Sequence, residues 1–180
     1  MRMITNTQVA EVFLQESIRA FQSMKKLADK AFAQTDEAFF YQTLDEESNS
    51  LEVLIKHMHG NMLSRWTDFL TSDGEKETRD RDGEFEGDQL SREELLLLWE
   101  AGWQVLFETL RSLTPDDVLS DIQIRGESLT VIQAIQRQVS HYGYHVGQIV
   151  LLCKHWASQD WNTLSIARGQ SKQFKPTKLS

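Results

Sequence analysis

Two histidines that can share one metal ion stand in the segment TVIQAIQRQVSHYGYHVGQIVLLCKHW, residues 130–156. They are His141 and His145. On an α-helix, side chains four residues apart lie one turn above the other on the same face, with Cβ atoms about 5 to 6 Å apart. Neutral imidazole is a common metal ligand, so two rings at this spacing can bind the same ion. We expect the chemistry of the chain at this pair.

The segment around the pair predicts a long amphipathic helix capped by Thr130. Its broad apolar face consists of Val131, Ile135, Val139, Tyr142, Val146, Ile149, Cys153 and Trp156. On a helical wheel His145 falls inside the edge of this face, and His141 lies just beyond it. The pair therefore points toward the core, where a polar ring needs a hydrogen-bond partner or a metal.

A third ligand has to come from another element. His155 lies ten residues past His145 on the same helix, which is about 15 Å along the axis. The remaining candidates are His57 and His59, in the predicted second helix DEESNSLEVLIKHMHGNMLSRWTDFL, residues 45–70. These two rings point about 200° apart, so at most one can face a given neighbouring helix. The wheel leaves both open, because His59 lies nearer the main apolar stripe.

Three neutral imidazoles would leave coordination positions open, which is typical of catalytic rather than structural zinc sites. A bound Zn²⁺ or Ni²⁺ would lower the pKa of a water or of a thiol toward about 7. Tyr142 follows His141, so the HExxH motif of metalloproteases is absent. We expect metal-dependent chemistry on a small-molecule substrate. The alternative is a non-catalytic metal-binding or stress-related helical protein.

The choice between reactions depends on a proton acceptor near the metal. Asn61, Tyr144 and Gln148 are the polar neighbours that spacing suggests, and none is a strong base. Hydrolysis would need such a base. Thiol transfer does not, because the metal itself favours the thiolate. The residues therefore favour a metal-dependent thiol transferase over a hydrolase.

The elements that position these residues are expected to be helical. The 180 residues include only 2 prolines and 9 glycines. Apolar residues recur with a period near 3.6 over long stretches. We expect one all-α domain over residues 1–180, with long helices at 7–32, 45–70, 91–113 and 130–156.

Three shorter parts complete the chain. Residues 71–90 carry eight carboxylates and three basic side chains, and we expect a solvated lid or rim. Residues 120–129 alternate about Arg125 and Gly126, which favours a small hairpin. Residues 161–180 carry several bases and no acid. This tail is expected either to drape over the acidic body or to stay loose.

Composition limits the partners. The net charge of −8, from 19 basic and 27 acidic residues, disfavours a nucleic-acid partner. No 18-residue apolar segment and no signal sequence is visible, so we expect no membrane partner and a cytoplasmic location. One cysteine, Cys153, excludes an internal disulfide, and its place on the apolar face indicates an inert thiol.

Long motifs resemble those of the DinB and YfiT-like superfamily. They are SNSLEVLIKHMHGNMLSRWTDFLTSDGEK at 48–76, RDRDGEFE at 79–86, HYGYHVGQI at 141–149 and RGQSKQF at 168–174. The resemblance spans nearly the whole chain and falls within a branch of small bacterial proteins. It implies a four-helix bundle of up-down-down-up topology that is commonly a homodimer.

The resemblance also implies a divalent metal held by one histidine of the second helix and by the HxxxH pair of the fourth. On this chain the ligands would be His57, His141 and His145, with His59 as the alternative to His57. Zn or Ni is the expected metal. Members of the superfamily include transferases that use a low-molecular-weight thiol such as mycothiol, bacillithiol or glutathione. Others are described as metal-dependent hydrolases.

Overall fold

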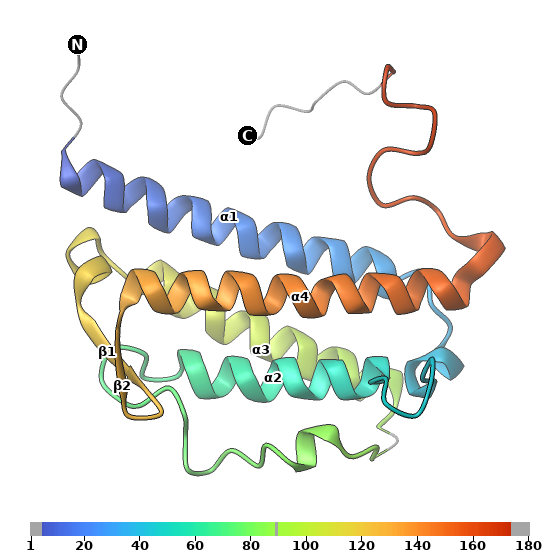
Figure 1. The fold of residues 1–180 in the computed structure, drawn as a ribbon, viewed down its shortest axis with the longest axis horizontal. Coiled ribbons are helices and arrows are strands. Elements are labelled where there is room, and N and C mark those ends of the chain that lie inside the picture. The colour runs from blue at the N-terminus through green and yellow to red at the C-terminus, as the bar shows by residue number, and fades with distance from the viewer. Residues whose placement is uncertain (1–4, 89, 174–180) are drawn as a thin grey trace.

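Four long helices make up most of the computed structural model, which describes residues 5–88 and 90–173 (Figure 1). The helices are α1 (Asn6–Phe32), α2 (Leu51–Trp66), α3 (Arg92–Ser112) and α4 (Val131–Ala157). Strands β1 (Asp121–Ile124) and β2 (Glu127–Thr130) form a small antiparallel sheet. The chain is therefore mainly helical, as the sequence predicts, with one short hairpin before α4.

Hydrogen bonds near the helix ends show how the helices run. Thr109 Oγ1, near the end of α3, donates to the carbonyl oxygen of Trp66 at the end of α2 (2.8 Å). The Leu90 amide, before α3, donates to Glu52 in the first turn of α2 (2.9 Å). Asn162, after α4, donates to Gln34, after α1 (2.7 Å). In Figure 1, α1 and α4 accordingly run side by side in one direction and α2 and α3 in the other.

Side-chain caps begin each long helix. The predicted capping box of Ser91 with Glu94 is confirmed at α3, and the predicted Thr130 cap is confirmed at α4. Each cap satisfies backbone N–H groups that have no partner inside the helix. The caps therefore define where these two helices start.

The prediction that the second helix begins near Asp45 was wrong. The Asp45 carboxylate accepts hydrogen bonds from the Glu47 amide and from Ser48 Oγ, which stabilises a turn instead of a helix. Ser50 then caps α2 by accepting from the Val53 amide. The helix also ends at Trp66, earlier than predicted, so the buried ring of Phe69 belongs to the turn after it.

The predicted hairpin is confirmed, and it holds the start of α4. Arg125 and Gly126 form its turn with positive φ angles of 57° and 73°, as a type I′ turn requires. Asp73, far away in sequence, accepts hydrogen bonds from both of their amides. The Val131 amide donates to the Ser120 carbonyl, which joins the first residue of α4 to the residue before β1.

An aromatic cluster at the centre takes one ring from each long helix. Phe21 of α1 lies 6.1 Å from Trp66 of α2 and 5.8 Å from Tyr142 of α4 between ring centroids. Trp103 of α3 lies 5.9 Å from Tyr142. All four side chains are almost completely buried. Such rings contribute both buried apolar area and edge-to-face contacts, so the cluster holds the four helices together.

The tail is described only as far as residue 173. Its first part returns to α1, where Gln34 and Asn162 exchange two hydrogen bonds. Residues 174–180, including the last residue of the 168–174 motif, lie outside the described residues. A search of the described helices finds none with the length and hydropathy needed to span a membrane.

We predict that Phe21→Ala lowers the free energy of unfolding by about 3–5 kcal/mol, because the cavity cannot be filled by rings held on three other helices. Urea denaturation followed by circular dichroism measures the change. Val12→Ala is the control on the same helix, since Val12 is 56% exposed, and it should cost less than about 0.5 kcal/mol. Equal losses for the two variants would contradict a core role for Phe21.

Candidate metal centre

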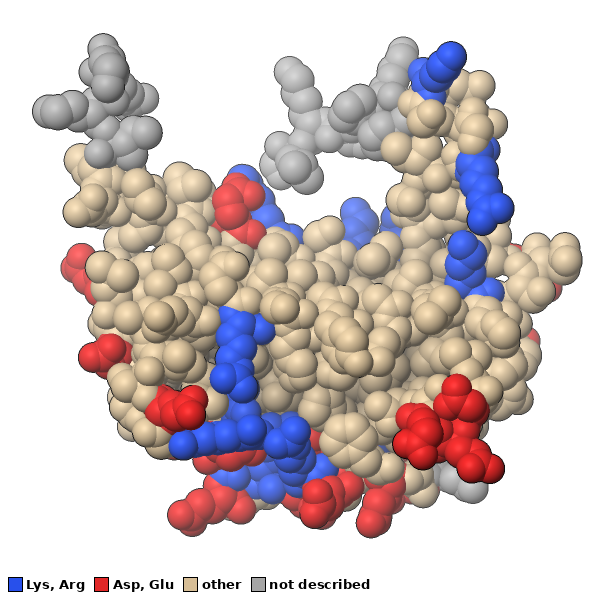
Figure 2. Space-filling model, in the orientation of Figure 1, with Lys and Arg blue, Asp and Glu red and all other residues tan. Residues whose placement is uncertain are grey.

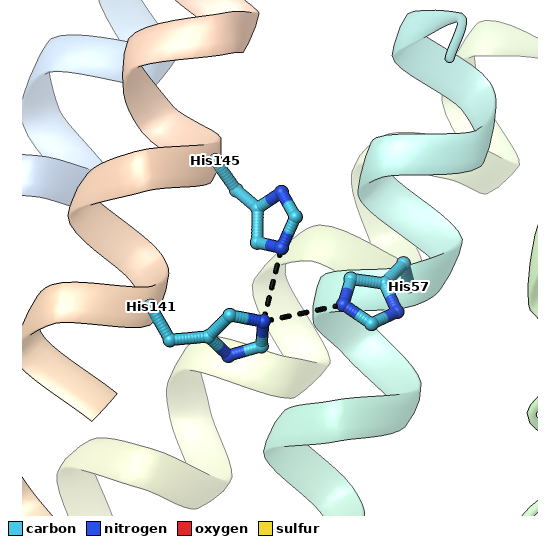
Figure 3. A group of neighbouring side chains, drawn as sticks. All are labelled: His57, His141 and His145. Atoms are coloured by element: carbon cyan, nitrogen blue, oxygen red, sulfur yellow. Dashed lines mark hydrogen bonds between the residues drawn. The ribbon is translucent and has the colours of Figure 1, made fainter. Parts of the chain in front are cut away.

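Three histidine side chains from two helices converge in one place. His57 comes from α2, and His141 and His145 come from adjacent turns of α4 (Figure 3). The Nε2 atom of His141 lies 3.0 Å from Nε2 of His145 and 3.4 Å from Nε2 of His57. One nitrogen from each ring lies within 4.8 Å of the others. This group can hold a metal ion.

These distances match the edge length of a tetrahedral site. Two nitrogens bound to the same zinc at about 2.0–2.1 Å, with a tetrahedral angle between them, lie about 3.3–3.4 Å apart. Two of the three separations, 3.0 and 3.4 Å, lie close to that value, and the ligand nitrogens of all three rings lie within 4.8 Å of one another. The rings therefore already lie near the positions that coordination of one ion would require.

The structure separates the two candidates that the wheel left open. His57 is buried and faces the α4 pair. His59 instead turns toward α3, where its Nδ1 lies 2.8 Å from the Leu98 carbonyl oxygen. Partial burial lowers the pKa of His59, so it stays neutral there as a half-buried, hydrogen-bonded residue. Of the two, only His57 is near His141 and His145.

The opposite nitrogens of two rings have hydrogen-bond acceptors. His57 Nδ1 lies 3.0 Å from Glu84 Oε2, and His145 Nδ1 lies 2.9 Å from Gln148 Oε1. An ionised carboxylate and an amide oxygen can only accept, so both Nδ1 atoms carry the proton. The Nε2 lone pairs of these rings are then directed toward His141. This is the tautomer that metal binding through Nε2 requires.

Glu84 is held against α2 from two sides. Arg79 donates to it through Nε (2.6 Å) and Nη2 (2.8 Å), a bidentate ion pair in which both side chains are less than 10% exposed. On the other side the carboxylate lies over Gly60, where a Cβ atom would be only 2.8 Å from Glu84 Cδ and would overlap with Oε1. A glycine in α2 is therefore required for Glu84 to reach His57.

A scan against family models finds a match over residues 8–170 to the family described as a protein of unknown function, DUF1572. The chain belongs to this family. Comparisons with curated proteins and with solved structures give no match.

In this DUF1572 chain, burial keeps the α4 histidines neutral. The pKa of His141 falls to about 3, first because the ring is buried and then because His145 and His57 would repel its positive charge. Burial also lowers the pKa of His145. Burial alone would raise the pKa of Glu84, but hydrogen bonds from Arg79 and His57 lower it below its usual value. At neutral pH two uncharged rings and a carboxylate are thus available at the site.

The histidines open onto a cavity of about 370 Å³. Its lining residues are His57, Asn61, Arg65, Arg79, Arg81, Phe85, Arg125, Arg137, Gln138, His141, Tyr144 and His145. Of the polar neighbours that spacing suggested, Asn61 and Tyr144 line the cavity, and Gln148 supports His145 from behind. A larger cavity of about 700 Å³ on the side of His59 is lined by neither His141 nor His145. The smaller cavity is therefore the one that reaches the three histidines.

Two residues at the site of this DUF1572 chain, Glu84 and Arg79, were not predicted from the sequence. Residues 71–90 were expected to be a solvated rim, yet Glu84 is buried and most of the Arg79 side chain is covered. Most of the described residues of this segment are exposed or half-buried, as expected, and the expectation failed at this pair, whose charges neutralise each other inside the fold. Gly60 was the available signal, since a glycine inside a helix costs about 1 kcal/mol and often marks a close approach.

We predict that the metal-free protein loses stability as the pH falls from 7 to 5. A folded pKa below the unfolded value of about 6.5 means that the unfolded chain takes up a proton that folded His141 refuses, so acid favours unfolding. The slope is at most about 1.4 kcal/mol per pH unit for each such histidine. Urea denaturation across this range measures it.

Comparison of His141→Gln with His155→Gln makes the pH test specific. The loss of unfolding free energy between pH 7 and pH 5 should be smaller in His141→Gln than in the unaltered chain. It should be unchanged in His155→Gln, because His155 is exposed. Ordinary carboxylates titrate below pH 5 and contribute little in this window. Identical slopes in His141→Gln and the unaltered chain would refute the assignment.

We predict that Glu84→Gln weakens metal affinity by about tenfold, because a charged acceptor behind an imidazole ligand raises its basicity and fixes its tautomer. Competition with a chromophoric chelator measures the affinity. Glu86→Gln removes the same charge from an exposed position two residues away and should leave the affinity unchanged. An unaltered affinity in a folded Glu84→Gln protein would show that this carboxylate does not support the metal.

Proposed function

We propose that the chain is a divalent-metal-binding protein of DinB-like type that transfers a low-molecular-weight thiol to a small-molecule substrate. One observation carries the proposal: three Nε2 atoms converge at the end of a cavity, and two of them have Nδ1 partners that free their lone pairs for a metal. Three ligands leave at least one coordination position for a substrate atom.

The arrangement of the helices supports the DinB-like part of the proposal. Hydrogen bonds near the helix ends are consistent with α2 running parallel to α3 and α4 parallel to α1, and Figure 1 draws the two pairs in opposite directions. This order corresponds to the up-down-down-up bundle that the resemblance implies. The histidines also lie on the second and fourth helices, as that resemblance requires.

When bound, Zn²⁺ or Ni²⁺ would supply a Lewis acid that lowers the pKa of a thiol toward neutrality. The chain's own residues supply orientation. Glu84 and Gln148 keep the protons of His57 and His145 on Nδ1, away from the cavity. Tyr144 and Phe85 line the cavity beside the histidines, and their rings can exclude water from one side of a bound thiol.

Thiol transfer is favoured over hydrolysis by the place of the nearest carboxylate. Glu84 already accepts from His57 and from Arg79, so it is not free to take a proton from water. The described residues that line the cavity include no Asp or Glu. A metal-dependent hydrolase would need such a base near its water. A thiol can instead lose its proton to solvent at neutral pH once its pKa is lowered.

Elemental analysis of protein purified without a histidine tag tests the proposal first. We expect near-stoichiometric Zn or Ni that is lost in His57→Ala and His145→Ala and kept in His59→Ala. The His59 variant is a matched control, since this half-buried histidine lies two residues away on the same helix. The next measurement is the optical spectrum of the Co²⁺-loaded protein during titration with a small thiol, where a sulfur-to-metal charge-transfer band is expected.

Two outcomes would overturn the proposal. If the unaltered chain contains no divalent metal and takes up none when offered, the proposed metal binding is wrong. A Co²⁺ spectrum that no thiol changes would leave a metal-binding protein without the thiol chemistry.

A further inference from the structure

The cavity above the three histidines carries positive charge in an acidic protein. Its lining includes Arg65, Arg79, Arg81, Arg125 and Arg137, and none of its described lining residues is acidic. The whole chain has a net charge of −8. Figure 2 shows Lys and Arg side chains gathered on this face, over the first half of α4 and over the segment that connects α2 to α3. Acidic side chains lie around them. A cavity lined by one sign of charge concentrates ligands of the opposite sign.

Three of the five arginines are engaged within the fold. Arg65 and Arg125 each donate to Glu75 at 2.8 Å, and Arg79 forms the bidentate pair with Glu84. These hydrogen bonds lower the pKa of Glu75 to about 2 in spite of its partial burial. Three guanidinium groups thus share two carboxylates, and the balance of this inner group is positive.

The other two arginines are exposed at the cavity. Among residues 5–88 and 90–173, no ion pair or side-chain hydrogen bond involves Arg81 or Arg137 within the structure. Arg137 stands four residues before His141 and eight before His145 on α4, so the three side chains follow one face of the helix. Arg81 lies in the segment between α2 and α3 and lines the same cavity. The two groups are free to bind a ligand whose other end reaches the histidines.

We propose that the substrate is a small anion, with a carboxylate or phosphate group bound by Arg81 and Arg137 and a metal-binding atom directed at the histidines. This inference rests on the proposed function and specifies its substrate class. Guanidinium groups suit the role because their paired N–H donors match carboxylate and phosphate oxygens. A cavity of about 370 Å³ is within the usual size for a small-molecule ligand. The rings of Phe85 and Tyr144 would contact its apolar middle.

Calorimetry with two small thiols tests the substrate class on the metal-loaded protein. The thiols are 3-mercaptopropionate, which carries a carboxylate, and 2-mercaptoethanol, which is neutral. At low ionic strength we expect the anionic thiol to bind about tenfold more tightly, because its carboxylate forms charge-assisted hydrogen bonds. Arg81→Gln and Arg137→Gln should each reduce this preference to about threefold, and the double variant should abolish it.

Lys154→Gln is the matched control, because it removes one exposed positive charge from the same helix outside the cavity. Its preference for the anionic thiol should equal that of the unaltered chain. Equal affinity for both thiols, or a preference that survives in the double variant, would overturn the inference.

A second titration separates this inference from the proposed function. Glutarate and inorganic phosphate, added separately to the metal-free protein and followed by NMR, contain no thiol and need no metal. We expect at least one of them to shift the resonances of the neighbouring cavity residues Gln138 and Tyr144 in the unaltered chain and in His145→Ala, and to leave these resonances unshifted in the double arginine variant. The ligand that binds identifies carboxylate or phosphate as the preferred group.

The two failures have different signatures. A protein that binds glutarate or phosphate at Arg81 and Arg137 but takes up no metal would lose the proposed function and keep the anion site. A protein that binds metal and thiol without any preference for anions, and that neither glutarate nor phosphate perturbs, would lose only the anion site.

Discussion

The rotation of α4 about its own axis is the constraint on which the candidate site depends. Tyr142 sets this rotation, because its buried hydroxyl accepts from Trp66 Nε1 (3.1 Å) and donates to Asn61 Oδ1 (3.0 Å). A buried hydroxyl without partners would cost several kcal/mol, so other rotations are disfavoured. Asn61 lies one turn beyond His57, and Tyr142 is next to His141. The same hydrogen bond that aligns the two helices therefore aligns their histidines.

A series of hydrogen-bonded polar and charged side chains links the segment between α2 and α3 to the site. Arg65, Glu75, Arg79, Glu84 and His57 follow one another through hydrogen bonds and ion pairs. Buried ion pairs seldom add net stability over apolar packing, because desolvation offsets their attraction. We infer that this series serves to position residues rather than to add stability. It holds the Glu84 carboxylate behind the His57 imidazole and fixes the segment between α2 and α3 against α2.

Local patterns explain the parts of the fold and site that the sequence predicted. His141 and His145 were identified because the i, i+4 spacing has the same meaning on any helix. The Arg125–Gly126 turn and the Ser91 and Thr130 caps are local in the same way, and the structure contains each of them.

Contacts across the fold explain the parts that remained open. His57 could not be separated from His59 by a wheel, because α2 is buried on most of its surface and has no single apolar face. Glu84 stands 27 residues from the ring that it contacts and lies in a connection without periodicity. Gly60 indicates that some segment approaches α2 closely, but no local pattern identifies Glu84 as the residue that does so.

At Gly60, the stability of α2 and the position of Glu84 beside His57 make opposite demands on the residue type. Alanine at this position would strengthen the isolated helix by up to about 1 kcal/mol. Its first carbon would also occupy the space of the Glu84 carboxylate and leave the ring of His57 without its partner. A thermostabilised form of this protein, obtained by replacing helical glycines, would therefore retain the helix at this position and lose the hydrogen bond between Glu84 and His57.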